Sequence, residues 1–96
     1  MFTVIRGKEA LDEFGRKLRA QRLHRNLTQA HLAKLAGLSI PTLVQLEKGK
    51  GGTSLANVAK VLGVMGLADQ LGQMLPEVEA KSLKAYLEAP VLRART

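Results

Sequence analysis

The sequence contains no cysteine and no tryptophan, and it has only one tyrosine and two phenylalanines. Without cysteine, the chain can form neither a disulfide framework nor a thiolate metal site, and it has no cysteine nucleophile. The two histidines, His24 and His31, have no carboxylates beside them at ligand spacing, so we expect no metal. No apolar run approaches the length of about 20 residues that a membrane-spanning helix needs. We therefore expect a cytoplasmic protein with no membrane segment.

Basic residues outnumber acidic ones by 15 to 8, which gives a formal net charge of +7. An excess of this size on 96 residues favours a polyanionic partner. Nucleic acid is the first candidate, ahead of an anionic membrane or an acidic protein. A chain of this length has room for one domain with one modest core. Composition alone therefore ranks nucleic acid first among the partners.

Almost every segment has the periodicity of helices rather than the alternation of strands, so the sequence predicts an all-α fold. Residues 2–5 are the one β-like run. We expect a short N-terminal arm at 1–7, a five-helix domain at 8–76 and a C-terminal extension at 77–96. The extension has one short helical pattern, and its basic end carries Arg93 and Arg95. We expect this extension to be weakly ordered.

The first and last helices of the expected domain are defined by apolar stripes. The first spans about residues 8–25, and the residues on its inward stripe are Leu11, Phe14, Gly15 and Leu18. A fourth helix begins at Thr53 or Ser54, and the fifth ends at Pro76. The apolar residues of the fifth helix exceed what one small core requires, so we divide them between the core and a homodimer interface. They are Leu67, Leu71, Met74 and Leu75.

Two short helices with a tight turn between them occupy the middle of the chain. Thr28 is expected to cap the first, Gly37 to end it, and Ser39 to cap the second. Leu43 and Leu46 fill the inward stripe of the second helix, which leaves its other residues outward. Two such helices within a basic chain are typical of a helix-turn-helix unit that reads DNA.

Residues 14–75 resemble the lambda-repressor and Cro-like family of XRE-type helix-turn-helix proteins. The residues that carry the resemblance are Phe14-Gly15 with Leu18 and Arg22, Thr28-Gln29 with Leu32-Ala33, Gly37-Leu38-Ser39, and Thr42-Leu43 with Leu46-Glu47 and Gly49. Each feature alone is weak, but the set at these spacings is specific. The resemblance implies a five-helix domain whose second and third helices form the DNA-reading unit.

The same resemblance assigns DNA-binding positions. Gln29 occupies the position that contacts a phosphate and supports the reading helix. Ile40, Pro41, Val44 and Gln45 match the outward positions of that helix. The family usually places polar or basic side chains there, and this sequence departs from the pattern. Gln45 alone could make a bidentate contact with adenine, whereas the other three could detect only thymine methyl groups and shape.

Further matched positions concern the DNA backbone and the fold. The residues that the resemblance places near phosphates are Ser39, Thr42, Lys48 and Lys50. Arg22 and Glu47 match a partly buried ion pair that fastens the first helix to the end of the reading helix. We expect this pair to orient the reading helix rather than to read bases.

The main hypothesis is a sequence-specific transcription regulator that represses its own promoter. One reading helix spans too few base pairs, so we expect a homodimer on an inverted repeat of double-stranded DNA, with half-sites about 34 Å apart. No catalytic constellation is present, so we expect no enzyme. Gly49-Lys50-Gly51 lacks the strand before it and the Ser or Thr after it that a phosphate-binding loop requires, so we expect no nucleotide cofactor.

Two alternatives stay open. Thr53-Ser54-Leu55, the short fifth helix and the basic tail are similar to the HipB-like antitoxins of toxin-antitoxin pairs. That similarity implies a second partner, a HipA-like, kinase-like toxin protein, in addition to operator DNA. The other alternative is nonspecific binding of nucleic acid or an anionic membrane by charge, which predicts indifference to sequence and a steep loss of affinity with salt.

Overall fold

The computed structural model describes residues 7–88, and every regular element in that range is a helix. The helices are α1 (Gly7–His24), α2 (Gln29–Ala36), α3 (Ile40–Glu47), α4 (Leu55–Val64), α5 (Asp69–Gln73) and α6 (Ala80–Glu88). The predicted all-α fold is confirmed. Helices α1 to α5 correspond to the five expected helices, and α6 falls in the extension. The arm before Gly7 and the basic end with Arg93 and Arg95 lie outside the described residues.

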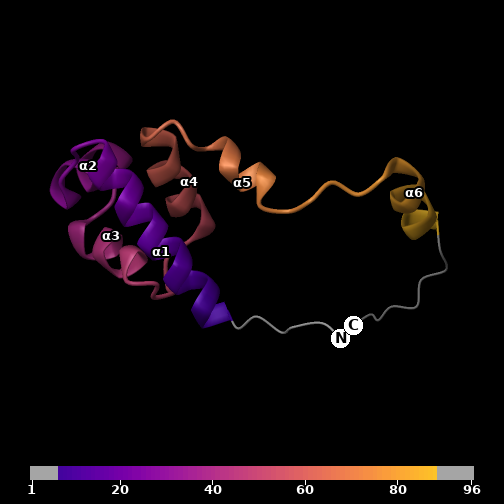
Figure 1. The fold of residues 1–96 in the computed structure, drawn as a ribbon, viewed down its shortest axis with the longest axis horizontal. Coiled ribbons are helices and arrows are strands. Elements are labelled where there is room, and N and C mark those ends of the chain that lie inside the picture. The colour runs from indigo at the N-terminus through magenta and orange to yellow at the C-terminus, as the bar shows by residue number, and fades with distance from the viewer. Residues whose placement is uncertain (1–6, 89–96) are drawn as a thin grey trace.

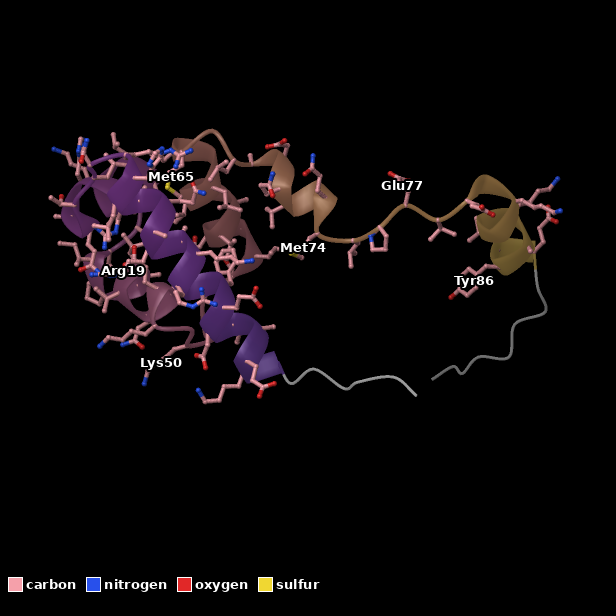
Figure 2. All side chains as sticks on the ribbon, in the orientation of Figure 1. Arg19, Lys50, Met65, Met74, Glu77 and Tyr86 are labelled. Atoms are coloured by element: carbon pink, nitrogen blue, oxygen red, sulfur yellow. The ribbon has the colours of Figure 1, made fainter. Side chains whose placement is uncertain are left out.

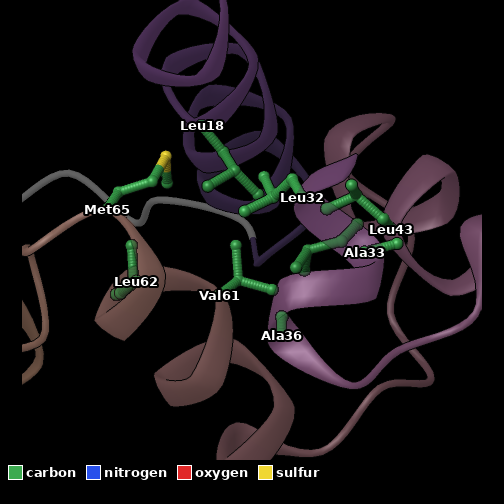
Figure 3. Packing of buried hydrophobic residues seen from close by; sticks show 9 residues of the cluster. Leu18, Leu32, Ala33, Ala36, Leu43, Val61, Leu62 and Met65 are labelled. Carbon is green, nitrogen blue, oxygen red and sulfur yellow. The ribbon is translucent and has the colours of Figure 1, made fainter. Parts of the chain in front are cut away.

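Helices α1 to α4 enclose a small aliphatic core. α2 packs against both α3 and α4, and α1 packs against α3. Figure 3 shows Leu18, Leu32 and Val61 pointing toward one another from three helices. The residues predicted to point inward from α2 and α3 are all buried, and they are Leu32, Ala33, Ala36, Leu43 and Leu46. Burying one such leucine contributes about 1.5–3 kcal/mol, so this core fixes α2 against α3.

Side-chain caps determine where the three shorter core helices begin. The hydroxyls of Thr28, Ser39 and Ser54 each accept a hydrogen bond from the backbone N–H three residues later, at 3.0, 3.2 and 3.1 Å. Each bond satisfies an amide that the helix itself leaves without a partner. Gly37 ends α2 with φ +72°, a conformation that glycine adopts without steric cost. The local sequence therefore fixes both ends of α2 and the start of α3.

Two glycines let the first helix approach the end of α3. A Cβ atom on Gly15 would lie 2.7 Å from the carbonyl oxygen of Leu46, which is closer than van der Waals contact allows. A Cβ atom on Gly49 would lie 2.7 Å from Cα of Asp12, and Gly49 also has φ +77°. α1 therefore rests on the last turn of α3 and on the loop that follows it.

Leu11 differs from the sequence prediction, which placed it on the inward stripe of the first helix. It is 40% exposed. The first turns of α1 extend past the core and lie beside the loop after α3, where Asp12 contacts Gly49. The inward stripe of α1 therefore begins at Phe14, which is half-buried against the core.

The fifth helix is shorter than predicted, because α5 covers only Asp69–Gln73. Pro76 follows closely, and the residue before a proline is kept out of the helical region by steric clash. The apolar residues of this segment divide between two environments. Those packed against the core are Leu67 and Leu71, and those left exposed are Met74 and Leu75.

The chain leaves the body of the molecule after α5. Residues 75–79 contain no helix, and Figure 1 shows them carrying α6 away from α1 to α4. Figure 2 shows Tyr86 on this separate helix, and the exposed fractions of Tyr86 and Leu87 are 78% and 69%. α6 therefore presents apolar side chains that the body does not cover. A helix of nine residues also has little stability on its own in water.

Candidate nucleic-acid interface

Helices α2 and α3 and the turn between them form one rigid unit. The N–H of Leu38, just after the turn, donates to the carbonyl of Ala33 at 2.8 Å. Leu32 and Leu43 are fully buried between the helices. Because the inward side of α3 is occupied in this way, its remaining surface lies at the edge of the molecule (Figure 1).

The outward surface of α3 is mainly apolar. Ile40 is 46% exposed, and Pro41 and Gln45 are also exposed. Val44, which was predicted to be outward, is half-buried, because it follows the inward Leu43 directly and lies at the border of the two faces. Gln45 is thus the one exposed residue of α3 whose side chain can both donate and accept a hydrogen bond.

The two hydroxyls near the start of α3 bind each other. Ser39 Oγ lies 2.8 Å from Thr42 Oγ1 and also accepts from the Thr42 N–H. One hydroxyl hydrogen is used within the pair, so the two side chains together retain one donor for an outside acceptor. Thr42 is half-buried and Ser39 is exposed. The sequence predicts both residues near phosphates, which stays a prediction, and the structure shows that they stabilise the first turn of α3.

A buried ion pair joins α1 to the last residue of α3. Arg22 Nε donates to Glu47 Oε2 at 2.7 Å and Arg22 Nη2 donates to Glu47 Oε1 at 3.1 Å. The exposed fractions of the two side chains are 7% and 3%. This two-pronged geometry fixes both the distance and the orientation of the partners. Arg22 also donates through Nη1 to the carbonyl of Leu27 at 2.8 Å, which ties in the segment that leads to α2.

Gln29 completes this arrangement from the first turn of α2. Its Nε2 donates to Glu47 Oε1 at 3.1 Å, and the side chain is half-buried. We call Arg22, Leu27, Gln29 and Glu47 the brace, because together they connect α1, α2 and α3. The predicted supporting role of Gln29 thus has a definite partner. One of the two Nε2 hydrogens is used toward Glu47, so the other hydrogen and the side-chain oxygen are left for other contacts.

Basic side chains lie beside this unit. Lys48 and Lys50 are exposed in the loop after α3, and Figure 2 shows Lys50 at the edge of the molecule. A cleft between this loop and the start of α1 is lined by both lysines and by Lys8. Lys8 was not among the predicted site residues, because nothing in the sequence indicates that the start of the first helix lies next to residues 48–51.

The remaining cations of α1 are distributed over its exposed side. Lys17 pairs with Glu13 at 2.9 Å, and this hydrogen bond lowers the pKa of the Glu13 carboxyl below its usual value. Arg25, half-buried in the turn directly after α1, donates to the carbonyl of Gln21 at 3.1 Å. Figure 2 shows Arg19 among the side chains at the surface. These contacts are local to the helix, so they orient the cations without linking α1 to another helix.

Within residues 7–88, no group of three or more histidine, aspartate or glutamate side chains is placed to hold a metal ion. The helices described in that range are also too short or too polar to cross a membrane.

A helix-turn-helix family model matches residues 18–70, which is more than half of the chain. The matched range runs from the middle of α1 into α5 and includes the complete α2–turn–α3 unit and the brace. A comparison with the curated proteins finds none that matches. The chain therefore belongs to the XRE-type helix-turn-helix family, the lambda-repressor and Cro-like group of DNA-binding regulators.

Proposed function

We propose that the protein is a homodimeric, sequence-specific repressor that places α3 of each subunit in the major groove of its own operator. The observation that carries the proposal is the exposed surface of α3, which the core does not use, held in a fixed orientation by the brace. Helix-turn-helix proteins of this kind contact base edges with the reading helix. A rigid, outward reading helix on a protein of charge +7 is suited to that role.

Each predicted site residue has a place in this proposal. Ile40, Pro41, Val44 and Gln45 face the bases, and Gln45 can make a bidentate contact with adenine. The residues assigned to phosphates are Gln29, Ser39, Thr42, Lys48 and Lys50. Phosphate contacts fix the register of α3 in the groove, whereas the contacts to bases supply the specificity. Arg22 and Glu47 have no contact with DNA in this scheme and act by holding α3.

A dimer is supported by the apolar side chains that the body leaves exposed after α5. The exposed fractions of Met74 and Leu75 are 61% and 73%. Met74 lines a groove between α1 and α5 that includes Phe14 and Leu71, and Leu75 follows it in the chain. Covering these side chains with a second copy would remove apolar surface from water. Two copies would also supply the two reading helices that an inverted repeat needs.

The experiment that tests the proposed function is selection of duplexes from a random pool at physiological salt, followed by sequencing of the retained DNA. Enrichment of an inverted repeat with half-sites one turn apart is the expected result. Retention without enrichment would overturn the proposal in favour of binding by charge alone. If an inverted repeat is enriched, sedimentation of the protein with the selected duplex gives the number of subunits bound.

A second candidate function, that of an antitoxin, is favoured by α6. This helix stands apart from the body and exposes Tyr86 and Leu87, so it offers apolar surface to another protein. An antitoxin of the HipB-like type would bind operator DNA with α3 and a kinase-like toxin with another surface. Co-expression with the product of a neighbouring reading frame tests this function. Stable copurification and loss of toxicity are expected, and separate elution of the two proteins would exclude it.

A further inference from the structure

The side chains at the start of α3 have unusual chemistry for a DNA-reading helix. Ile40 has 46% of its surface exposed although it belongs to the apolar class that proteins usually bury. Pro41 beside it is exposed as well, and Val44 is half-exposed one turn later. None of these three side chains can donate or accept a hydrogen bond. They form what we call the apolar strip of α3, defined as Ile40, Pro41 and Val44.

Three polar side chains of the α2–turn–α3 unit are already engaged. The hydroxyls of Ser39 and Thr42 bind each other at 2.8 Å, and Ser39 caps the helix. The amide nitrogen of Gln29 is committed to Glu47. Turning any of these side chains across the strip toward a base edge would therefore break an existing hydrogen bond. Gln45 is the exposed amide on α3, and it lies one turn after Pro41.

An apolar strip can recognise only one feature of the major groove. Adenine, guanine and cytosine present hydrogen-bond donors and acceptors there, whereas thymine also presents its C5-methyl group. A polar base edge covered by Ile40 or Val44 would lose water and gain no partner, which costs free energy. A methyl group against the same side chains removes apolar surface from water at no such cost.

We propose that the apolar strip makes α3 a reader of pyrimidine C5-methyl groups, so that the half-site carries thymines opposite Ile40, Pro41 and Val44 next to an adenine opposite Gln45. The proposal rests on the proposed function, because it requires α3 to lie in the major groove. It goes further in naming the chemical group that is recognised. It also implies that 5-methylcytosine is read like thymine at these positions, because its methyl group occupies the same place in the groove.

The test uses the duplex retained by the selection described above, with single thymines of one half-site replaced by deoxyuridine. This change removes the methyl group and leaves base pairing unchanged. Affinity is expected to fall about fourfold at each contacted thymine, the factor that corresponds to burying one methyl-sized group. At the same positions, 5-methylcytosine is expected to bind about fourfold more tightly than cytosine. Equal affinities for thymine and uracil at every position would overturn the proposal.

A variant of the protein tests whether the apolar strip causes the preference for thymine over uracil. Ile40→Ala is expected to lose the preference for thymine over uracil at the one position that Ile40 contacts. It is expected to keep that preference at the positions opposite Pro41 and Val44. Leu23→Ala is the matched control, because Leu23 is also 46% exposed but lies on α1. This control should keep the full discrimination. If Ile40→Ala keeps it too, the strip does not read the methyl group.

The outcomes separate this inference from the function on which it rests. A specific operator that tolerates uracil throughout would leave the proposed repressor intact and overturn methyl reading. A selected half-site without thymines would do the same. A pool with no enriched sequence would overturn both, because no half-site would then exist to be read.

Discussion

Glu47 is the residue on which three segments of the chain converge. Its carboxylate accepts two hydrogen bonds from Arg22 and one from Gln29, and its side chain is 3% exposed. Burying two charges costs solvation energy, which the pair regains only through good geometry and additional hydrogen bonds. The brace supplies both. Its main effect is therefore to fix the orientation of α3 relative to α1 and α2.

Glu47→Gln should lower the free energy of unfolding by about 3–5 kcal/mol, because Arg22 would be left buried without its opposite charge. Urea denaturation followed by circular dichroism measures this change. Lys8→Met is the control, since its pair with Asp12 is 3.2 Å long but the Lys8 side chain is 80% exposed. Exposed pairs contribute about 0–1 kcal/mol. Similar losses in the free energy of unfolding of the two variants would show that the brace contributes no more to stability than an exposed ion pair.

Gln45→Ala should reduce discrimination between the operator and a variant at the contacted adenine by about 1–3 kcal/mol per half-site. The reason is that Gln45 is the exposed amide on α3 able to bind adenine at two points. Titration of fluorescent duplexes measures the ratio of affinities. Lys48→Ala should instead weaken binding to both duplexes equally. Unchanged discrimination in Gln45→Ala would mean that a different residue of α3 faces that base.

Single residues differ in how far the sequence predicts them. The caps Thr28 and Ser39 follow from local sequence, because each bonds to an amide three residues away. The pair of Arg22 and Glu47 spans 25 positions, and only resemblance to a family indicated it. The carbonyl of Leu27 as a further partner of Arg22 had no sequence signal, because every residue has a carbonyl and packing decides which one is reached.

At the scale of helices, the crossing of α1 over α3 depends on a missing side chain. Gly15 lies where the backbone of α1 meets the last turn of α3, next to the backbone of Glu47 in the brace. The sequence predicted that Gly15 lies on the inward stripe. It could not predict the partner, because periodicity gives the direction of a residue and not what it meets.

Gly15→Ala should destabilise the fold by about 1–3 kcal/mol, because the added carbon would lie 2.7 Å from the carbonyl oxygen of Leu46 and force the helices apart. Thermal unfolding measures the effect. Gly63→Ala is the matched control within α4, where an added carbon meets no atom within 4 Å. That variant should gain about 0.5–1 kcal/mol from helix propensity. Stabilisation by Gly15→Ala would contradict the close crossing.

The segment around α5 shows where periodicity stops being informative. A stripe of apolar residues is the same whether it faces the core of its own chain or a partner. Leu67 and Leu71 pack on the core, whereas Met74 and Leu75 do not, although all four belong to one pattern. The number of helical turns of this segment that can pack against the core decides which of the four residues are buried. That number depends on the arrangement of α1 to α4, which the sequence of α5 does not contain.

At the scale of the molecule, residues 7–88 form a helical body that contains the brace and α3, and a separate α6 at the end of a linker. The helix pairs that pack closely are α1 with α3, α2 with α3 and α2 with α4, and α6 is in none of them. The two proposed functions therefore place DNA reading and partner binding in different parts of the chain. The sequence predicts the same division, between residues 76 and 77, and this boundary stays a prediction.

Removal of residues 77–96 should leave both the folding and the DNA binding of the body intact. The deletion removes four basic and three acidic residues, so the net charge falls by only one and electrostatic attraction to DNA is nearly unchanged. The buried core residues lie between Leu18 and Met65, and the last residue packed against them is Leu71, so the melting temperature should stay the same within error. Calorimetry and operator titration measure the two properties.

A weaker affinity together with a change from dimer to monomer in sedimentation would show that α6 joins the subunits. An unchanged affinity together with loss of binding to a copurifying protein would assign α6 to that partner. A large fall in melting temperature would contradict the separation of α6 from the body.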